Sequence, residues 1–276
     1  MSLLVTCDGG GWKTPVRLKG RLNDRLPDVG VLRLPEPGLD SAVSIPIGAS
    51  SIQNVTDDPV LHVAVPQCGG RRCDRAANLA ARKIALHSGA DLIVNEYRAD
   101  LVNVGRSLHH RSLFPAPVRE LPEATRKAIV EEIYTPYRNR VRQRIEQLLC
   151  SWSYVVHLSI RTFEAKSANG QWRRGDLGLQ YDSSRPDEVD WCLDAIDELY
   201  DAVPNLKVRR NHPHRGTNDS LTKSMRSEFS PEVYLGIEID LNRAWAARPV
   251  ARRDLVLDLI GQAIGGLKAE PIRMAA

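Results

Sequence analysis

Residues 154–160, Tyr-Val-Val-His-Leu-Ser-Ile, form a nearly continuous apolar run that decides the fold class. A strand that is apolar on both faces is typical of the centre of a largely parallel sheet, because helices cover both sides of such a sheet. Further along the chain, residues 186–203 have apolar side chains at alternating steps of three and four, as in an amphipathic helix. This alternation of strands and helices predicts a three-layer α/β/α domain with a mixed central sheet.

The remaining elements follow the same alternation. Residues 13–60 are rich in Pro, Gly, Ser and Asp and lack a sustained period, so we expect a long irregular excursion there, of the kind that is often functional. Pro136 is expected to interrupt a helix and separate it from a second one. No internal repeat divides the chain, and a single domain over 1–276 is expected. Strands are expected at 3–6, 92–94, 206–209 and 233–240, and helices at 74–87, 123–134, 218–229 and 254–264.

The composition excludes several classes of protein. No apolar stretch approaches the roughly 18 residues of a membrane span, and the first residues lack the pattern of a signal peptide, so a soluble cytoplasmic protein is expected. The 5 cysteines are odd in number and form no C-x-x-C pair, which argues against a disulfide framework and a zinc knuckle.

The charge indicates what the protein binds. The 38 basic and 34 acidic residues are too balanced to indicate nucleic-acid binding. Most of the basic residues are arginines, which suit bidentate recognition of carboxylates and phosphates. An arginine-rich cleft would therefore favour a small anionic ligand, although a solvated surface is the more common explanation for any single arginine.

Some titratable residues lie in unusual surroundings. His157 lies inside the apolar strand, where a histidine is more often a hydrogen-bonded core residue than a metal ligand. His212 and His214 flank Pro213, and both a metal pair and a surface loop are consistent with that spacing. Glu238 lies in the apolar stretch Leu-Gly-Ile-Glu-Ile, so its carboxylate needs a partner such as an arginine. A structural salt bridge and an active-site base both remain open for Glu238.

A series of motifs runs in order through residues 3–243. From N- to C-terminus they are VTCDGGG (5–11), CDRAA (73–77), the arginine-rich segment 97–114, YTPYR (134–138), HLSIRTF (157–163), RRGDLGL (173–179), NHPHRG (211–216) and GIEI (236–239). In this order they resemble the N-formylglutamate amidohydrolase family, zinc-dependent α/β amide hydrolases related to the zinc carboxypeptidases.

The resemblance assigns roles to particular residues. It implies a zinc-exopeptidase-like fold in which zinc polarises an amide carbonyl and activates water. It implies that Glu238 serves as the general base and that Arg98, Arg106, Arg173 and Asn211 bind the substrate. The expected ligand is therefore a small carboxylate or an N-acyl amino acid.

The chain departs from the family pattern at the metal-binding positions. Asp8 replaces a glutamate, Gly9 replaces a histidine and Arg161 replaces a second histidine. Zinc needs three protein ligands, so no zinc site is expected at these degenerate positions. We expect Asp8, Arg161 and Glu238 to converge at one end of the sheet, with the Arg161 guanidinium bonding both carboxylates in the place of the metal.

Two functions are consistent with these departures. The first is a binding protein that keeps the anion pocket without hydrolysis. The alternative is an active amidohydrolase that cleaves the amide C–N bond of an N-acyl amino acid and holds its metal with other residues, such as His157 or His109.

Overall fold

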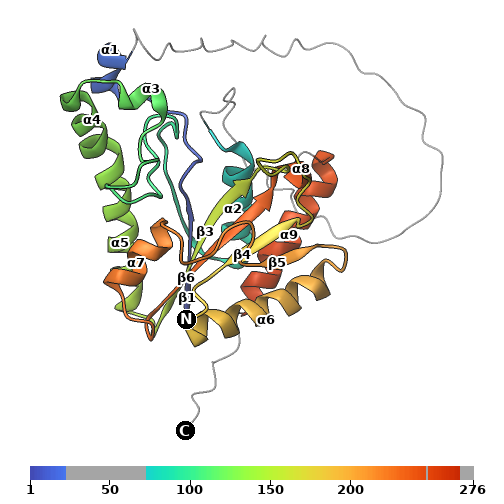
Figure 1. Cartoon of the computed structure of the whole chain (residues 1–276). Coiled ribbons are helices and arrows are strands. Elements are labelled where there is room, and N and C mark those ends of the chain that lie inside the picture. Colours follow the sequence, from blue (N-terminus) through green and yellow to red (C-terminus); the bar gives the residue numbers. More distant parts are fainter. Residues whose placement is uncertain (23–72, 247, 268–276) are drawn as a thin grey trace, which may run out of the picture.

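The computed structural model describes residues 1–22, 73–246 and 248–267, and its centre is a single sheet (Figure 1). The strand order is β2-β1-β3-β6-β4-β5. Neighbouring strands are parallel except for β4, which runs antiparallel to β6. The predicted mixed sheet is therefore confirmed. The strands are β1 (Ser2–Cys7), β2 (Asp91–Val94), β3 (Val155–Phe163), β4 (Leu177–Gln180), β5 (Val208–Arg210) and β6 (Tyr234–Asn242).

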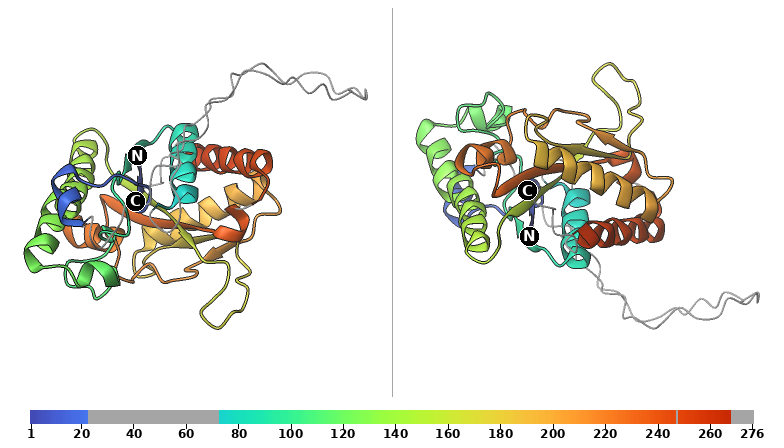
Figure 2. Two further views of the ribbon diagram at one scale, coloured as in Figure 1. Left: turned by 90° about the horizontal axis from the view of Figure 1, so that it is seen from above. Right: turned by 90° about the horizontal axis from the view of Figure 1, so that it is seen from below.

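Helices cover both faces of this sheet, as Figures 1 and 2 show. Alternate side chains of a strand point to opposite faces, so Leu3 of β1 enters one hydrophobic core and Leu4 enters the other. The three-layer arrangement is therefore confirmed. The first core includes residues of the helices α2 (Arg75–Ser88), α6 (Pro186–Ala202) and α9 (Val250–Gly266). The second core includes residues of the helices α4 (Glu123–Ile129), α5 (Thr135–Leu149) and α7 (Leu221–Glu228). The short helices are η1 (Val16–Leu18), α1 (Lys19–Leu22), α3 (Ala116–Arg119) and α8 (Arg243–Ala246).

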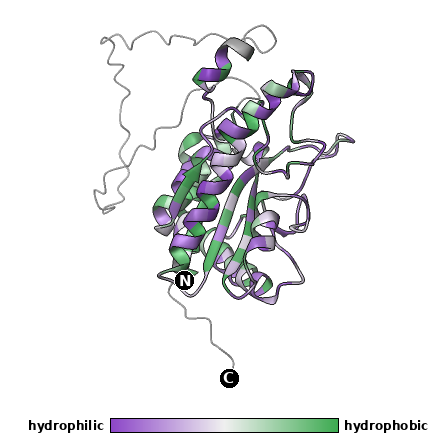
Figure 3. Ribbon diagram, turned by 90° about the vertical axis from the view of Figure 1, so that its left-hand side faces the viewer, coloured by the Kyte–Doolittle hydropathy of each residue, from purple (hydrophilic) through white to green (hydrophobic). Residues whose placement is uncertain are grey.

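Local signals in the sequence set several helix ends. Asp74 caps α2 by accepting a hydrogen bond from the Ala77 N–H at 3.1 Å, and α2 ends at Gly89, whose left-handed φ of 60° favours glycine. Ser220 caps α7 by accepting a bond from the Lys223 N–H at 3.2 Å. In Figure 3 the outward side of the α4 and α5 layer is largely hydrophilic, as expected for helices that bury one face.

Two expectations about local structure are wrong. Pro136 does not interrupt its helix: α4 continues through a π-helical turn, η3 (Val130–Tyr134), directly into α5. The wider turn accommodates the proline, which has no N–H to donate to the preceding turn. The sequence also predicted no strand at 177–180, where β4 forms, because four residues are too short to establish a period.

The surface excursion expected at 13–60 falls mainly outside the described residues. Within the described part of the chain, no helix combines the length and the apolar character needed to cross a membrane.

Candidate functional site

The carboxyl-terminal ends of β1, β3 and β6 bring charged side chains to one face of the sheet. Arg161 of β3 is in register with Asp240 of β6, and Glu238 lies two residues earlier on the same face. The Arg161 Nη1 atom lies 2.6 Å from Glu238 Oε2, and its Nε atom lies 3.8 Å from Asp240 Oδ1. Asp8, directly after β1, is close enough for Arg161 and Glu238 to shift its pKa. Asp8, Arg161 and Glu238 therefore meet at one end of the sheet, as predicted.

Glu238 is held by contacts on both carboxylate oxygens. Its side chain is only 3% exposed. Arg161 donates to Oε2, and the Thr222 hydroxyl of α7 donates to Oε1 at 2.9 Å. The carboxylate thus has the arginine partner that its apolar strand predicted.

The partners of Arg161 differ from the expectation in one respect. Arg161 was expected to bond Asp8 and Glu238, but its second carboxylate is Asp240, because register places that residue on the neighbouring strand. Asp8 instead accepts a hydrogen bond from the Tyr137 hydroxyl at 2.7 Å. Burial raises the pKa of Asp8, while the Tyr137 bond and the charge of Arg161 lower it.

Asp240 is a site residue that the sequence reasoning missed. Burial raises its pKa to about 6, the charge of Arg161 opposes this, and the charges of Glu238 and Asp74 add to it. Its Oδ2 accepts a hydrogen bond from Gln180, and its buried Oδ1 has no hydrogen bond within the described residues. The two-residue spacing from Glu238 on a strand was the signal that could have revealed it.

We expect Asp240→Asn to stabilise the protein near neutral pH. The pKa of Asp240 in the folded protein lies above the usual 3.8, so its protonated carboxyl group contributes to the free energy of unfolding at low pH. That stabilising contribution is complete below about pH 4 and is lost as the pH rises through about 6. Asparagine does not ionise and still accepts from Gln180. Unfolding in urea at pH 4 and pH 7.5 should show that the variant gains stability relative to wild type at the higher pH; an equal difference at both pH values would contradict this.

Two of the expected substrate-binding arginines lie near this cluster. Arg106 is partly buried, and its pKa is lowered by burial and by the charge of Arg161. Arg173 donates to the Glu164 carbonyl at 3.2 Å and packs over the Phe163 ring. Burial lowers the pKa of His214, and so do the charges of Arg161, Arg173 and Arg106. The charges of the three guanidinium groups therefore all act on one imidazole, that of His214.

The other two expected substrate-binding residues, Arg98 and Asn211, make their contacts within loops. Arg98 is 2% exposed and donates bidentately to Asp100 at 2.8 and 2.7 Å, so this pair, and not a ligand, occupies that edge of its guanidinium. Asn211 has a φ of 48°, a left-handed conformation that asparagine tolerates. Its Oδ1 accepts from the N–H groups of Tyr181 and Gly216 at 3.1 and 3.0 Å, which shapes the turn leading to His214.

His157 is the hydrogen-bonded core histidine that its strand predicted. Its Nε2 lies 2.8 Å from the Thr6 hydroxyl, and its Nδ1 lies 2.8 Å from the Tyr234 hydroxyl. Burial and the nearby charge of Arg226 lower its pKa to about 3, so it is neutral. With both ring nitrogens in use, His157 is unsuited to replace a lost metal ligand; His109 lies exposed on a loop.

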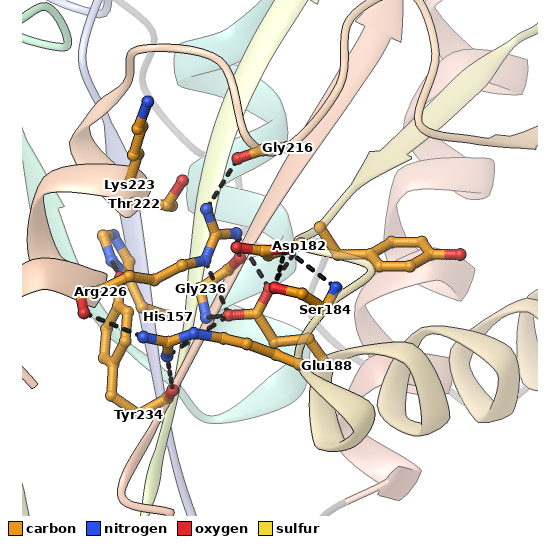
Figure 4. A network of polar contacts seen from close by, with 12 residues as sticks. His157, Asp182, Ser184, Glu188, Gly216, Thr222, Lys223, Arg226, Tyr234 and Gly236 are labelled. Atoms are coloured by element: carbon orange, nitrogen blue, oxygen red, sulfur yellow. Dashed lines mark hydrogen bonds and ion pairs between the residues drawn. The ribbon is translucent and has the colours of Figure 1, made fainter. Parts of the chain in front are cut away.

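A buried ion pair that the sequence did not reveal joins Arg226 to Glu188 next to Gly236 of β6 (Figure 4). Arg226 of α7 donates to both carboxylate oxygens of Glu188 of α6, at 2.8 and 3.0 Å. Its guanidinium also donates to the carbonyls of Gly216, at 2.7 Å, and Gly236. The pair therefore joins two helices to the turn after His214 and to the strand that carries Glu238. The sequence analysis singled out neither residue.

The residues present do not fit the zinc ion that the family fold implies. Zinc requires three donors with lone pairs, whereas position 9 is glycine and the Arg161 guanidinium offers only N–H groups. That guanidinium also bonds the buried carboxylate of Glu238 directly. Among the described residues, no three His, Cys, Asp or Glu side chains are grouped so that they could hold a metal.

Solved structures share the fold of this chain. A gene product of Agrobacterium tumefaciens is 20% identical, with a TM-score of 0.64, and the match covers 97% of this chain and 92% of that one. The N-formylglutamate amidohydrolase of Ralstonia eutropha JMP134 is 13% identical, with a TM-score of 0.57, and the match covers 97% and 93% of the two chains. At these identities the likeness establishes the fold alone. No curated protein is significantly similar in sequence.

A family model gives the stronger result. The model described as N-formylglutamate amidohydrolase matches residues 70–247, which is more than half of the 276 residues. The matched segment includes Arg106, Arg161, Arg173 and Glu238, the residues around which the site is built. The chain therefore belongs to the N-formylglutamate amidohydrolase family.

Proposed function

We propose that this chain is a member of its family with a degenerate zinc site, and that it binds a small carboxylate or acyl amino acid without hydrolysing it. The observation that carries the proposal is the 2.6 Å contact between Arg161 and the buried Glu238. A permanently charged guanidinium there neutralises carboxylates that would otherwise repel one another in a partly desolvated site. Arg161 thus supplies the positive charge that zinc supplies in the resembling enzymes.

The same guanidinium offers a binding edge to a ligand. Arg161 is 27% exposed, and its Nη2 atom makes no hydrogen bond to the residues that the structure describes. Arg106 and Arg173 add positive charge nearby, as their joint effect on the pKa of His214 indicates. A carboxylate placed among these groups would receive charge-assisted hydrogen bonds.

Arg161 does not replace zinc in hydrolysis, because a guanidinium has no coordination position for water and cannot lower the pKa of a bound water as a metal does. Glu238 occupies the general-base position of the family. Here we assign it as the counterion of Arg161, because both of its oxygens already accept hydrogen bonds. An active hydrolase would need a metal held by other residues.

Metal analysis and calorimetry test the proposal together. Purified protein incubated with zinc and then desalted should contain well under one equivalent of the metal. It should bind glutarate or N-acetyl-L-glutamate in titration calorimetry and should not hydrolyse N-formyl-L-glutamate. Stoichiometric zinc at this site together with turnover would establish the alternative, an amidohydrolase with altered metal ligation.

Arg106→Lys should weaken carboxylate binding by about tenfold, because lysine keeps the charge and loses the planar pair of donors. Arg252→Lys on the exposed surface of α9 is the matched control and should leave the affinity unchanged. Calorimetry with glutarate measures both variants. Equal affinities for wild type and Arg106→Lys would remove Arg106 from the site.

A further inference from the structure

Asp8 has an oxygen that nothing in the described structure uses. Its Oδ1 accepts the hydrogen bond from Tyr137, but its Oδ2 accepts none from the described residues. That oxygen lies against Gly105, where an added Cβ would come within 2.6 Å of it. The glycine thus leaves room for the carboxylate and provides no side-chain donor. The residue as a whole keeps part of its surface exposed.

Nearby cations do not satisfy this carboxylate directly. Arg161, which lowers the pKa of Asp8 by its charge, donates a hydrogen bond from Nη1 to Glu238, and its Nε lies 3.8 Å from Asp240 Oδ1. Burial outweighs these charges and raises the pKa of Asp8, so its ionised form is incompletely compensated. A carboxylate with an unused oxygen in such surroundings favours a cationic hydrogen-bond donor.

The other side of the site has the opposite charge. Arg106 directly follows Gly105 in the chain, and its pKa is lowered by burial and by the charge of Arg161, as expected where positive charges crowd together. Because Gly105 lies against the Asp8 carboxylate, the backbone of Arg106 begins next to it. An acceptor and cationic groups therefore lie at the same end of the sheet.

We propose that the ligand of this site is a free α-amino acid, whose ammonium group binds Asp8 Oδ2 and whose carboxylate binds Arg106 and Arg161. This inference rests on the proposed function and narrows its ligand. A free α-amino acid carries an ammonium group and a carboxylate on one Cα. The ammonium matches the acceptor of Asp8, and the carboxylate matches the cationic donors beside it. An N-acyl amino acid has a neutral amide at that position, which offers one N–H and no charge, so it leaves Asp8 uncompensated.

The experiment compares each free amino acid with its N-acetyl derivative. Thermal-shift screening of the twenty pairs identifies the best ligand, and calorimetry then measures both members of that pair. At least one free amino acid should bind the wild-type protein about tenfold tighter than its derivative. The Asp8→Asn variant can still accept the hydrogen bond from Tyr137 but has lost the charge that selects the ammonium group. It should therefore bind the free amino acid and its derivative with about equal affinity. Asp190→Asn, an exposed change on α6, should keep the preference.

The outcomes separate the two proposals. If N-acetyl derivatives or glutarate bind and no free amino acid is preferred, the ammonium site is wrong and the carboxylate-binding function stands. A preference that survives in a folded Asp8→Asn protein also overturns the role of Asp8. If none of these molecules binds the wild-type protein, both proposals fail. Circular dichroism of the variant checks its fold, and the wild-type preference alone decides the ligand class if the variant does not fold.

Discussion

Replacing Arg226 by alanine is expected to lower the free energy of unfolding by about 4 kcal/mol, since it leaves a buried carboxylate without its cation. Glu188 is 1% exposed and would keep only the hydrogen bonds from the N–H groups of Asp182 and Gly236, at 2.9 and 3.0 Å, together with the more distant Arg185 at 3.9 Å. The Gly216 and Gly236 carbonyls would lose a donor as well. Denaturant unfolding monitored by circular dichroism measures the loss.

A matched exposed pair provides the control for this variant. Arg142 is 50% exposed and lies 3.4 Å from Glu146, so Arg142→Ala should cost at most about 0.5 kcal/mol. The double variant Glu188→Gln with Arg226→Met should lose less than the sum of its single variants, because no unpaired charge remains. A cost for Arg226→Ala no larger than that for Arg142→Ala would show that the buried pair has no special importance.

The Arg226 pair should also affect ligand binding from a distance. It holds Gly216, which follows His214, and Gly236, which precedes Glu238 by two residues on β6. Loosening either segment displaces groups of the site without removing any of them. A positioning role therefore predicts weaker carboxylate binding by the folded fraction of the variant.

Replacing Arg161 by alanine is expected to cost about 3 kcal/mol of stability and to abolish measurable carboxylate binding. The change leaves Glu238 and Asp240 buried beside each other without their shared cation. Because the charge of Arg161 holds the pKa of Asp240 down, its loss moves that pKa above about 6. Asp240 is protonated in both proteins at pH 4 and ionised in the wild type at pH 7.5, so the destabilisation should be larger at pH 7.5.

Arg161→Lys separates charge from geometry. Lysine keeps a cation beside the carboxylates and should recover part of the stability, while it lacks the planar edge that binds a ligand carboxylate. Urea unfolding at the two pH values and calorimetry with glutarate measure both properties. Wild-type stability in Arg161→Ala would contradict the assignment of this residue as the replacement for the metal's charge.

The sequence predicted most of the fold because its strong signals are local. The apolar run that became β3, the Asp74 cap and the Gly89 stop of α2 each depend on neighbouring residues alone. Two signals failed for the same reason. β4 is only four residues long, and it forms a strand because it pairs with β6. Pro136 is accommodated by the π-helical turn before it, which the presence of a proline does not predict.

For the site, the sequence by itself determined that Glu238 needed a cationic partner, because the cost of burying a charge requires no coordinates. The metal positions that differ from the family pattern stay a prediction from the resemblance. Only the tertiary structure decided which groups meet. Strand register paired Arg161 with Asp240 and left Asp8 to Tyr137, a long-range ion pair joined Glu188 of α6 to Arg226 of α7, and a buried pair formed between Arg98 and Asp100. Most of these contacts link residues far apart in the chain, whose distances follow from the packing of whole elements and not from any local pattern.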